Sequence, residues 1–234
     1  QRIQTSILPN NKIIRQYLPK LFIYYKPRDV VSGDFPWFFV KEDNIYIAAV
    51  DCTGHGVPGA LLSFIGYFIL NNVVDHDATY SASKILDLLH FGVRKTLKQD
   101  RHDADARDGM DIALCKINLK KKTLQYAGAH RPLYLLRNKE LEEFKGDRKA
   151  IGGIPNLKKE ENDFTNYLID LKPGDKIFFF SDGLPDQVGG EDKKKYGPAR
   201  IREKIVENQS LTMPQFNELF ENDFNSYKGE NKQI

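Results

Sequence analysis

Along the chain, hydrophobic residues form short continuous runs in some segments and recur with the three- to four-residue spacing of helices in others. Runs rich in aromatic and β-branched residues, bounded by polar turns, predict strands. Longer runs with helical spacing predict helices. The predicted strands are 21–26, 35–40, 45–50, 110–118, 123–126, 133–136, 141–144, 166–171 and 176–180. The predicted helices are 60–74, 81–97, 196–206 and 213–224.

Several predicted strands come in pairs joined by short polar turns. The turns fall at 42–44, 119–122 and 137–140, each between two apolar runs, and this spacing is typical of hairpins. The helices are grouped between and after the strands and do not alternate with single strands. That order favours an α+β layered domain, with antiparallel sheets and outer helices, over a doubly wound parallel sheet.

Composition and charge narrow the class of protein. The 234 residues include 35 basic and 32 acidic side chains, a formal charge of +3, so the total charge does not indicate nucleic acid as a partner. A hydrophobic fraction of 41%, with 15 Phe and 11 Tyr, is sufficient for a substantial core. The longest apolar stretch, 61–70, is about half of a membrane span. With no internal repeat, the chain is predicted to be one soluble globular domain.

The two cysteines, Cys52 and Cys115, argue against several kinds of chemistry. They form no CxxC pair, so neither a disulfide framework nor a structural zinc site is predicted, and a reducing compartment fits. Neither cysteine is followed by Arg six positions later, because Pro58 and Lys121 stand there. The sequence therefore lacks the phosphate-binding loop of cysteine phosphatases.

Three aspartates stand beside glycines where an apolar strand meets a turn. They occur in Ser32-Gly33-Asp34-Phe35, in Asp51-Cys52-Thr53-Gly54-His55-Gly56 and in Phe180-Ser181-Asp182-Gly183. Asp-Gly pairs also make ordinary turns. If the three carboxylates converge at a sheet edge, they form an oxygen-rich site suited to Mg²⁺ or Mn²⁺. The case is strongest for Asp51, which follows a long strand and leads directly into a predicted buried helix.

Two nucleotide-binding motifs are matched only in part. Residues 54–59 read G-x-G-x-x-G between a strand and a helix, and Asp75 lies near where a ribose-binding acid is expected. A dinucleotide fold then needs a second parallel strand, whereas the sequence after Asp77 indicates a helix. The same stretch has Ala60 and Leu61 where a P-loop requires Lys and Ser/Thr. We therefore interpret the match at 54–59 as accidental.

Polar residues near these motifs have both a chemical and a structural interpretation. His55 can act as a general acid in a carboxylate-rich site or can simply cap the turn, and both interpretations stay open. His130, at a turn between two strands, is predicted to be structural. Asp108 and Asp111 bracket the start of a strand, and capping of the strand end is favoured there over contact with a third metal ion.

Taken together, these segments resemble one protein family. Residues 26–35, 49–62 and 172–183, in this order, look like the bacterial SpoIIE/RsbU-type serine/threonine phosphatases, a branch of the metal-dependent PPM (PP2C-like) superfamily. The similarity covers 8–234 and includes Gly128-Ala129-His130-Arg131-Pro132. Each motif alone is weak, but the ordered set is specific. The resemblance implies a PPM-type layered sandwich, with two antiparallel β-sheets packed face to face and flanked by α-helices.

The resemblance also implies a two-metal centre. Asp51 would bridge two Mg²⁺ or Mn²⁺ ions, and Asp34 would hold one ion while Asp182 holds the other. The backbone carbonyl of Cys52 would complete part of the shell. A metal-activated water would then hydrolyse phosphoserine or phosphothreonine without a covalent phosphoenzyme.

Four further residues receive expected roles around that centre. His55 is the candidate catalytic acid, and Arg28 lies near where related eukaryotic enzymes keep a phosphate-binding arginine. The turn glycines Gly54 and Gly183 are expected to border the bound substrate or ions.

The family implies partners and a wider context as well. The expected substrate is a phosphorylated anti-sigma-factor antagonist of the STAS type, and an upstream sensor domain is expected in the same polypeptide. Residues 1–18 would be the end of a linker helix leading into a phosphatase domain at 19–234. We expect a cytoplasmic domain, with a membrane-anchored sensor protein and a homodimer as candidate settings.

The sequence departs from the family pattern at its end. Family members continue beyond the equivalent of Lys232-Gln233-Ile234 with an Asp-Asp pair that opens a last apolar strand, and one of those aspartates is a metal ligand. If the chain ends here, we expect weaker metal binding and impaired activity. The alternative hypothesis is a catalytically silent or impaired module that keeps the fold and binds a partner.

Overall fold

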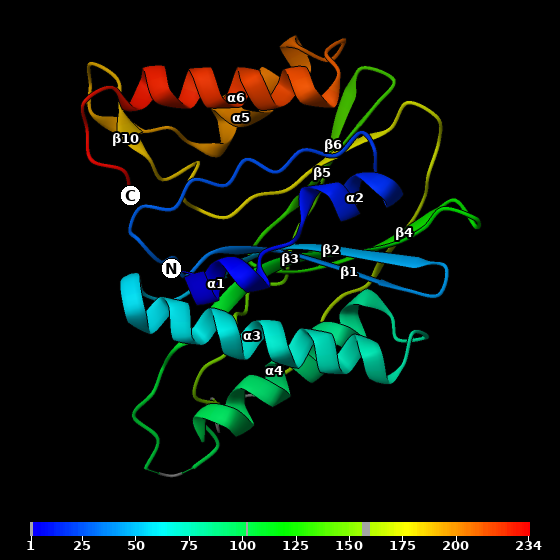
Figure 1. Cartoon of the computed structure of the whole chain (residues 1–234), viewed down its shortest axis with the longest axis vertical. Coiled ribbons are helices and arrows are strands. Elements are labelled where there is room, and N and C mark those ends of the chain that lie inside the picture. The colour runs from blue at the N-terminus through cyan, green and yellow to red at the C-terminus, as the bar shows by residue number, and fades with distance from the viewer. Residues whose placement is uncertain (1, 102, 156–159) are drawn as a thin grey trace.

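Two antiparallel sheets lie between layers of helices in the computed structural model, which describes residues 2–101, 103–155 and 160–234 (Figure 1). The larger sheet has the order β1-β2-β3-β4-β8, with the short β7 paired to β3. The smaller sheet has the order β6-β5-β9, and β10 pairs with β11 in a separate ribbon. The strands are β1 (Phe35–Lys41), β2 (Asn44–Cys52), β3 (Gly109–Asn118), β4 (Thr123–Ala129), β5 (Leu133–Arg137), β6 (Glu140–Phe144), β7 (Ile151–Gly152), β8 (Tyr167–Asp170), β9 (Lys176–Phe178), β10 (Val188–Gly189) and β11 (Lys194–Lys195).

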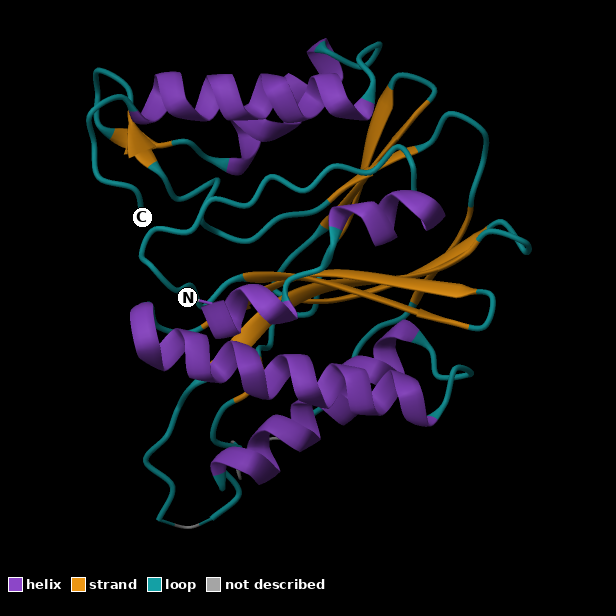
Figure 2. Ribbon diagram, viewed as in Figure 1, coloured by secondary structure: helices purple, strands orange, loops and turns teal. Residues whose placement is uncertain are grey.

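The longer helices cover the outer faces of the two sheets, as Figure 2 shows. Helices α3 and α4 lie against the larger sheet, while α5 and α6 lie on the side of the smaller sheet. Helix α4 begins where the Ser81 side chain accepts a hydrogen bond from the Lys84 N–H, and α6 begins with a capping box formed by Thr212 and Gln215. The helices are α1 (Arg2–Ile7), α2 (Asn11–Tyr17), α3 (Gly56–His76), α4 (Ala82–Leu97), α5 (Pro198–Glu207) and α6 (Met213–Lys228).

The larger sheet is buried on both faces, and the alternation of side chains along β2 shows how. Ile45 and Ile47 point toward the smaller sheet, where they belong to one apolar cluster with Leu133 and Leu135 of β5. The intervening side chains, such as Tyr46, belong to a second cluster with residues of α3 and α4. The predicted face-to-face packing of two antiparallel sheets with outer helices is therefore confirmed.

The smaller sheet is covered in the same way on its other face. Tyr134 of β5 and Phe178 of β9 share a third cluster with Ile201 of α5 and Phe216 of α6. The Phe178 and Phe216 rings meet edge to face, with their centroids 5.0 Å apart. This third layer of contacts attaches the C-terminal helices to the sheet.

Most predicted elements are present, with shifted ends. The helix predicted at 60–74 starts earlier, at Gly56, so the Gly-rich turn already belongs to its first turn. The strands on either side of turn 172–175 lie in different sheets, because β8 pairs with β4 and β9 pairs with β5. The chain thus crosses from one sheet to the other at this turn.

The strand predicted at 21–26 is wrong. In the described part of the chain these residues are extended but belong to no ladder, and no backbone–backbone hydrogen bond joins 22–26 to another segment. Their aromatic and β-branched composition is typical of a strand, but no neighbouring strand pairs with them.

Helices α1 and α2 bear on the predicted linker helix, and α3, the longest helix, contains the longest apolar stretch of the chain. Helices α1 and α2 occupy the segment predicted as a linker helix; Gln1 lies outside the described residues, and the linker role stays a prediction. By length and composition, α3 could cross a membrane, which is weak evidence because core helices pass the same test. Leu70 and Val74 of α3 are fully buried in the core beside the larger sheet.

Asp223 of α6 joins the two C-terminal helices. Its carboxylate accepts hydrogen bonds from Arg200 of α5 and from the Tyr196 hydroxyl, and Lys204 lies 3.0 Å away. Burial alone would raise the pKa of Asp223, but the bonds from Arg200, Tyr196 and Lys204 outweigh burial and lower it to about 2.

We expect Asp223→Asn to lower the free energy of unfolding by about 2 kcal/mol at pH 7, because the pKa shift is worth about that much. The contribution is fully present above the ordinary carboxyl pKa and is lost as the pH falls through about 2. Urea unfolding between pH 7 and pH 2 measures it, with exposed Glu218→Gln on the same helix as control. A difference from the wild type that stays constant over this range contradicts the assignment.

Candidate functional site

The three aspartates singled out in the sequence meet at one end of the sandwich. Asp34 immediately precedes β1, Asp51 lies near the end of β2, and Asp182 follows β9. The Asp182 N–H donates a hydrogen bond of 3.1 Å to Asp51 Oδ2. The Asp34 carboxyl interacts with the side chains of Asp51 and Ser181. Segments separated by more than a hundred residues therefore bring three carboxylates together.

Close backbone contacts between glycines hold this arrangement. A Cβ on Gly33 would lie 2.8 Å from the Gly54 carbonyl oxygen and 2.9 Å from that of Cys52. A Cβ on Gly59, in the first turn of α3, would lie 2.6 Å from the same Gly54 oxygen. The glycines thus let the loop carrying Asp34 rest directly on the turn that follows Asp51.

Burial of the carboxylates, followed by their mutual repulsion, dominates the electrostatics of the site. Burial, followed by the neighbouring charge of Asp34, raises the pKa of Asp51 to about 8, although Arg131 acts in the opposite direction. Burial also raises the pKa of Asp34. An additional positive charge would relieve this repulsion, and carboxylate oxygens are the ligands that Mg²⁺ and Mn²⁺ prefer. By donor type and charge, the residues fit a divalent cation.

Arg131 lies among these carboxylates and was not singled out by the sequence. Its Nη2 atom is 2.6 Å from Asp51 Oδ2, 3.0 Å from Asp182 Oδ2 and 3.1 Å from Asp111 Oδ2. Asp111 is the direct cross-strand partner of Asp51 in the β2–β3 pairing. Within the described ranges, no three Asp, Glu, His or Cys side chains are already arranged around a position for an ion.

The structure shows what Asp111, His130 and Asp108 contact at the ends of β3 and β4. Asp111 was interpreted as a strand cap, but it contacts both Arg131 and His130, whose Nδ1 lies 2.9 Å from Asp111 Oδ1. His130 itself has a left-handed φ of 57° at the turn after β4, as a structural turn residue would. Asp108 lies 3.4 Å from the Thr53 hydroxyl, at the edge of the site.

Arg28 and His55 lie close together, and both contact Asp29. Arg28 Nη2 is 3.2 Å and His55 Nδ1 is 3.5 Å from Asp29 Oδ2, and the His55 side chain is 74% exposed. Among the contacts of the described residues, neither side chain bonds to Asp34, Asp51 or Asp182. Their predicted catalytic roles stay predictions.

The remaining predicted site residues border the carboxylates. The Cys52 thiol belongs to the apolar core, where burial raises its pKa, while its backbone carbonyl faces Gly33. Gly54 has a φ of +82°, which the turn after Asp51 requires. A Cβ on Gly183 would lie 3.9 Å from Asp34 Oδ2, so this glycine adjoins the site. The packing around it leaves room for a side chain.

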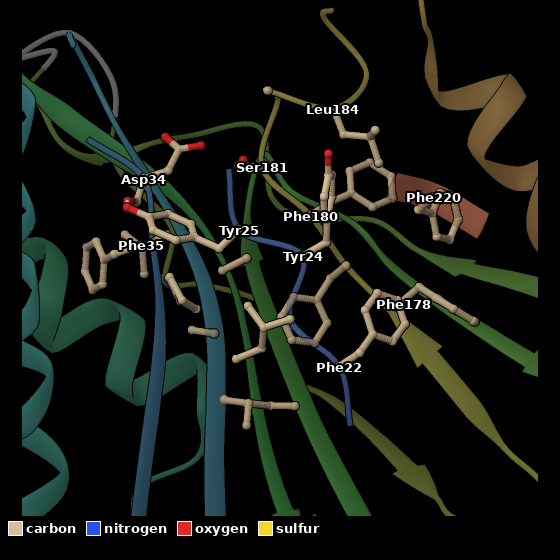
Figure 3. Close-up of a pocket in the computed structure, with 18 of the residues that line it drawn as sticks. Phe22, Tyr24, Tyr25, Asp34, Phe35, Phe178, Phe180, Ser181, Leu184 and Phe220 are labelled. Carbon is tan, nitrogen blue, oxygen red and sulfur yellow. The ribbon is translucent and has the colours of Figure 1, made fainter. Parts of the chain in front are cut away.

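A large cavity opens beside the carboxylates. It has a volume of about 1380 Å³ and is lined by Asp34, Asp51, Arg131 and Asp182 in one part. Figure 3 shows Asp34 and Ser181 at one end and aromatic side chains, including Phe22 and Phe178, along the rest. The unpaired segment 21–26 forms part of this apolar wall.

Comparisons with known proteins agree with this architecture. The fold is that of PP2C-like phosphatase domains: the SiaA-PP2C domain of Pseudomonas aeruginosa is 31% identical, with a TM-score of 0.86, over 99% of this chain and 88% of that chain. A family model described as Stage II sporulation protein E (SpoIIE) matches residues 41–233. The chain therefore belongs to the SpoIIE family, and the resemblance seen in the sequence is confirmed.

Two further proteins share less of their sequence with this chain. Phosphoserine phosphatase RsbU of Bacillus subtilis (strain 168) is 25% identical over 161 residues, which are 68% of this chain and 44% of RsbU. The chain therefore spans less than half the length of that relative. A structure of RsbX in complex with magnesium is 16% identical, with a TM-score of 0.57, over 90% of this chain and 88% of that chain, and this likeness concerns the fold alone.

The close approach at Gly33 predicts a matched pair of stability effects. Gly33→Ala forces its Cβ against two carbonyl oxygens, so we expect a loss of about 1–3 kcal/mol in the free energy of unfolding. Gly183→Ala has room, with its nearest atom at 3.8 Å, and should be nearly neutral. Urea unfolding compares the two variants, and equal stabilities contradict the packing argument.

Proposed function

We propose that this chain is a metal-dependent protein serine/threonine phosphatase domain that hydrolyses phosphoserine or phosphothreonine. The observation that carries the proposal is the convergence beside a cavity of Asp34 and Asp51, from the β1–β2 hairpin, with Asp182, from the segment after β9. Membership of the SpoIIE family and the likeness to phosphoserine phosphatase RsbU support the reaction class.

In this proposal the chain binds Mg²⁺ or Mn²⁺ at the carboxylate cluster. Asp51 would contact two ions, Asp34 one and Asp182 the other, and the Cys52 carbonyl would supply a further oxygen. Bound divalent ions supply positive charge against the phosphate and acidify water. The raised pKa of Asp51, which reflects burial and carboxylate repulsion, supports a site that gains from added cations.

The chain's own groups would orient the ligands. The Asp182 N–H holds Asp51 Oδ2, and Ser181 interacts with Asp34, so two ligands are restrained by the segment that carries the third. Arg28 and His55, beside the same cavity, are placed to meet a phosphoprotein at its surface. In this proposal Arg28 contacts the phosphate and His55 protonates the leaving oxygen.

The family resemblance supports a proposal for the substrate and the setting. We take the substrate to be a phosphorylated STAS-type anti-sigma-factor antagonist. The phosphatase would be the cytoplasmic output of a sensor domain in the same polypeptide.

Replacement of the central carboxylate tests the reaction. We expect the chain to release phosphate from a phosphoserine protein only with Mn²⁺ or Mg²⁺, and Asp51→Asn to lower kcat/KM by about 100-fold or more, because the shared ligand is lost. Colorimetric phosphate release measures the rate.

Asp75→Asn is the matched control. Asp75 lies near the opposite end of α3, with a side chain that is 77% exposed, and its loss should leave the rate unchanged. Phosphate release that is independent of metal, or equal rates for Asp51→Asn and the wild type, would sink the proposal.

A further inference from the structure

Arg131 reaches three carboxylates through a single nitrogen. Its Nη2 contacts Asp51 at 2.6 Å, Asp182 at 3.0 Å and Asp111 at 3.1 Å, and the side chain is only 17% exposed. These three oxygens come from β2, β3 and the segment after β9. One guanidinium nitrogen therefore holds together acidic groups that would otherwise repel one another across both sheets.

The backbone of Arg131 is fixed, so any displacement must be made by the side chain. The Tyr126 hydroxyl donates a hydrogen bond of 2.5 Å to the Arg131 carbonyl, and the preceding His130 N–H donates one of 2.8 Å to the Asp147 carbonyl. A Cβ on Gly146 would lie 2.9 Å from the Arg131 carbonyl oxygen, so this loop is closely packed.

The guanidinium, by contrast, donates its hydrogen bonds to the cluster through Nη2, and its other groups are less well paired. Its Nε is buried and has no hydrogen-bond partner among the described residues. Arg137 on β5 shows the alternative, because its Nε and Nη2 bond both oxygens of Asp175 at 2.8 and 2.6 Å. An arginine with an unpaired buried donor loses less when its guanidinium leaves.

The guanidinium and a divalent ion cannot both occupy these oxygens. Asp51 and Asp182 are ligands in the proposed metal centre, and Arg131 Nη2 already lies within hydrogen-bond distance of both. An ion bound there would stand next to a positive nitrogen, and their repulsion is stronger beside partly buried groups such as Asp51 and Arg131 than it would be in bulk water. The adjoining cavity, which Arg131 also lines, offers space for the displaced side chain.

We propose that Arg131 is an internal counter-ion that competes with divalent cations for Asp51, Asp111 and Asp182, and that its side chain leaves the cluster when metal binds. The inference rests on the metal centre proposed above. Without metal, Arg131 keeps the carboxylates together and stabilises the site. With metal, the same contacts are lost, so Arg131 lowers metal affinity and sets the concentration at which the site fills.

Calorimetric titration with MnCl₂, and thermal unfolding in EDTA and in Mn²⁺, test the inference on the whole chain. Arg131→Gln removes the charge but keeps hydrogen-bonding capacity. We expect it to bind Mn²⁺ about tenfold more tightly or better, which corresponds to the loss of a close repulsive charge. We also expect a lower Tm in EDTA and a larger gain in Tm on adding Mn²⁺ than for the wild type.

Arg131→Lys and Arg137→Gln are the controls. The lysine variant retains the charge and should stay close to the wild-type affinity. Arg137→Gln removes an arginine from an ion pair with Asp175, outside the cluster, and should lower Tm without changing Mn²⁺ affinity. If Arg131→Gln unfolds in EDTA but folds in Mn²⁺, that rescue also supports the inference.

The outcomes separate this inference from the proposed function. Mn²⁺ binding by the wild type with unchanged or weaker binding by Arg131→Gln overturns the competition and leaves the metal centre in place. Binding by the variant alone supports the competition and contradicts a functional metal centre in the wild-type chain. Absence of binding in both proteins overturns both proposals.

Discussion

The contact between the two sheets is the constraint on which the site depends. Asp51 belongs to the larger sheet, whereas Asp182 follows the last strand of the smaller one. Their relative position is set by the apolar layer in which Ile45 and Ile47 of β2 meet Leu133 and Leu135 of β5. Because this layer is closely packed, the two carboxylates are held together at the end of the sandwich despite their repulsion.

That repulsion is what makes the cluster chemically useful. Four carboxylates with one arginine in a partly buried site have negative charge in excess, and the raised pKa of Asp51 reflects burial together with its acidic neighbours. A bound cation would offset this excess negative charge. In the metal-free protein Arg131 supplies part of that charge, and in our account a divalent metal ion supplies more of it and adds Lewis acidity.

Much of the fold could be predicted from the sequence, because strands buried on both faces appear as continuous apolar runs and amphipathic helices as apolar residues at helical spacing. The apolar run at 45–50 and the helical spacing at 81–97 correspond to β2 and α4. The segment 21–26 misled the prediction, because a run of aromatic and β-branched residues does not report whether a neighbouring strand is available. The arrangement of the sheets came from the family resemblance, not from local patterns.

The candidate site could be predicted only in part, because only some of its residues have a local signal in the sequence. Asp34, Asp51 and Asp182 stand out because each lies at a strand end within three residues of a glycine. Asp111 and Arg131 could not be found in this way, because their place depends on the register that sets Asp51 opposite Asp111, sixty residues away.

The most direct test of the proposed metal centre is a crystal structure with Mn²⁺ and its anomalous map. Our account predicts manganese peaks bounded by Asp34, Asp51 and Asp182, with the Arg131 guanidinium moved away, whereas a cluster without manganese and still holding Arg131 would contradict it.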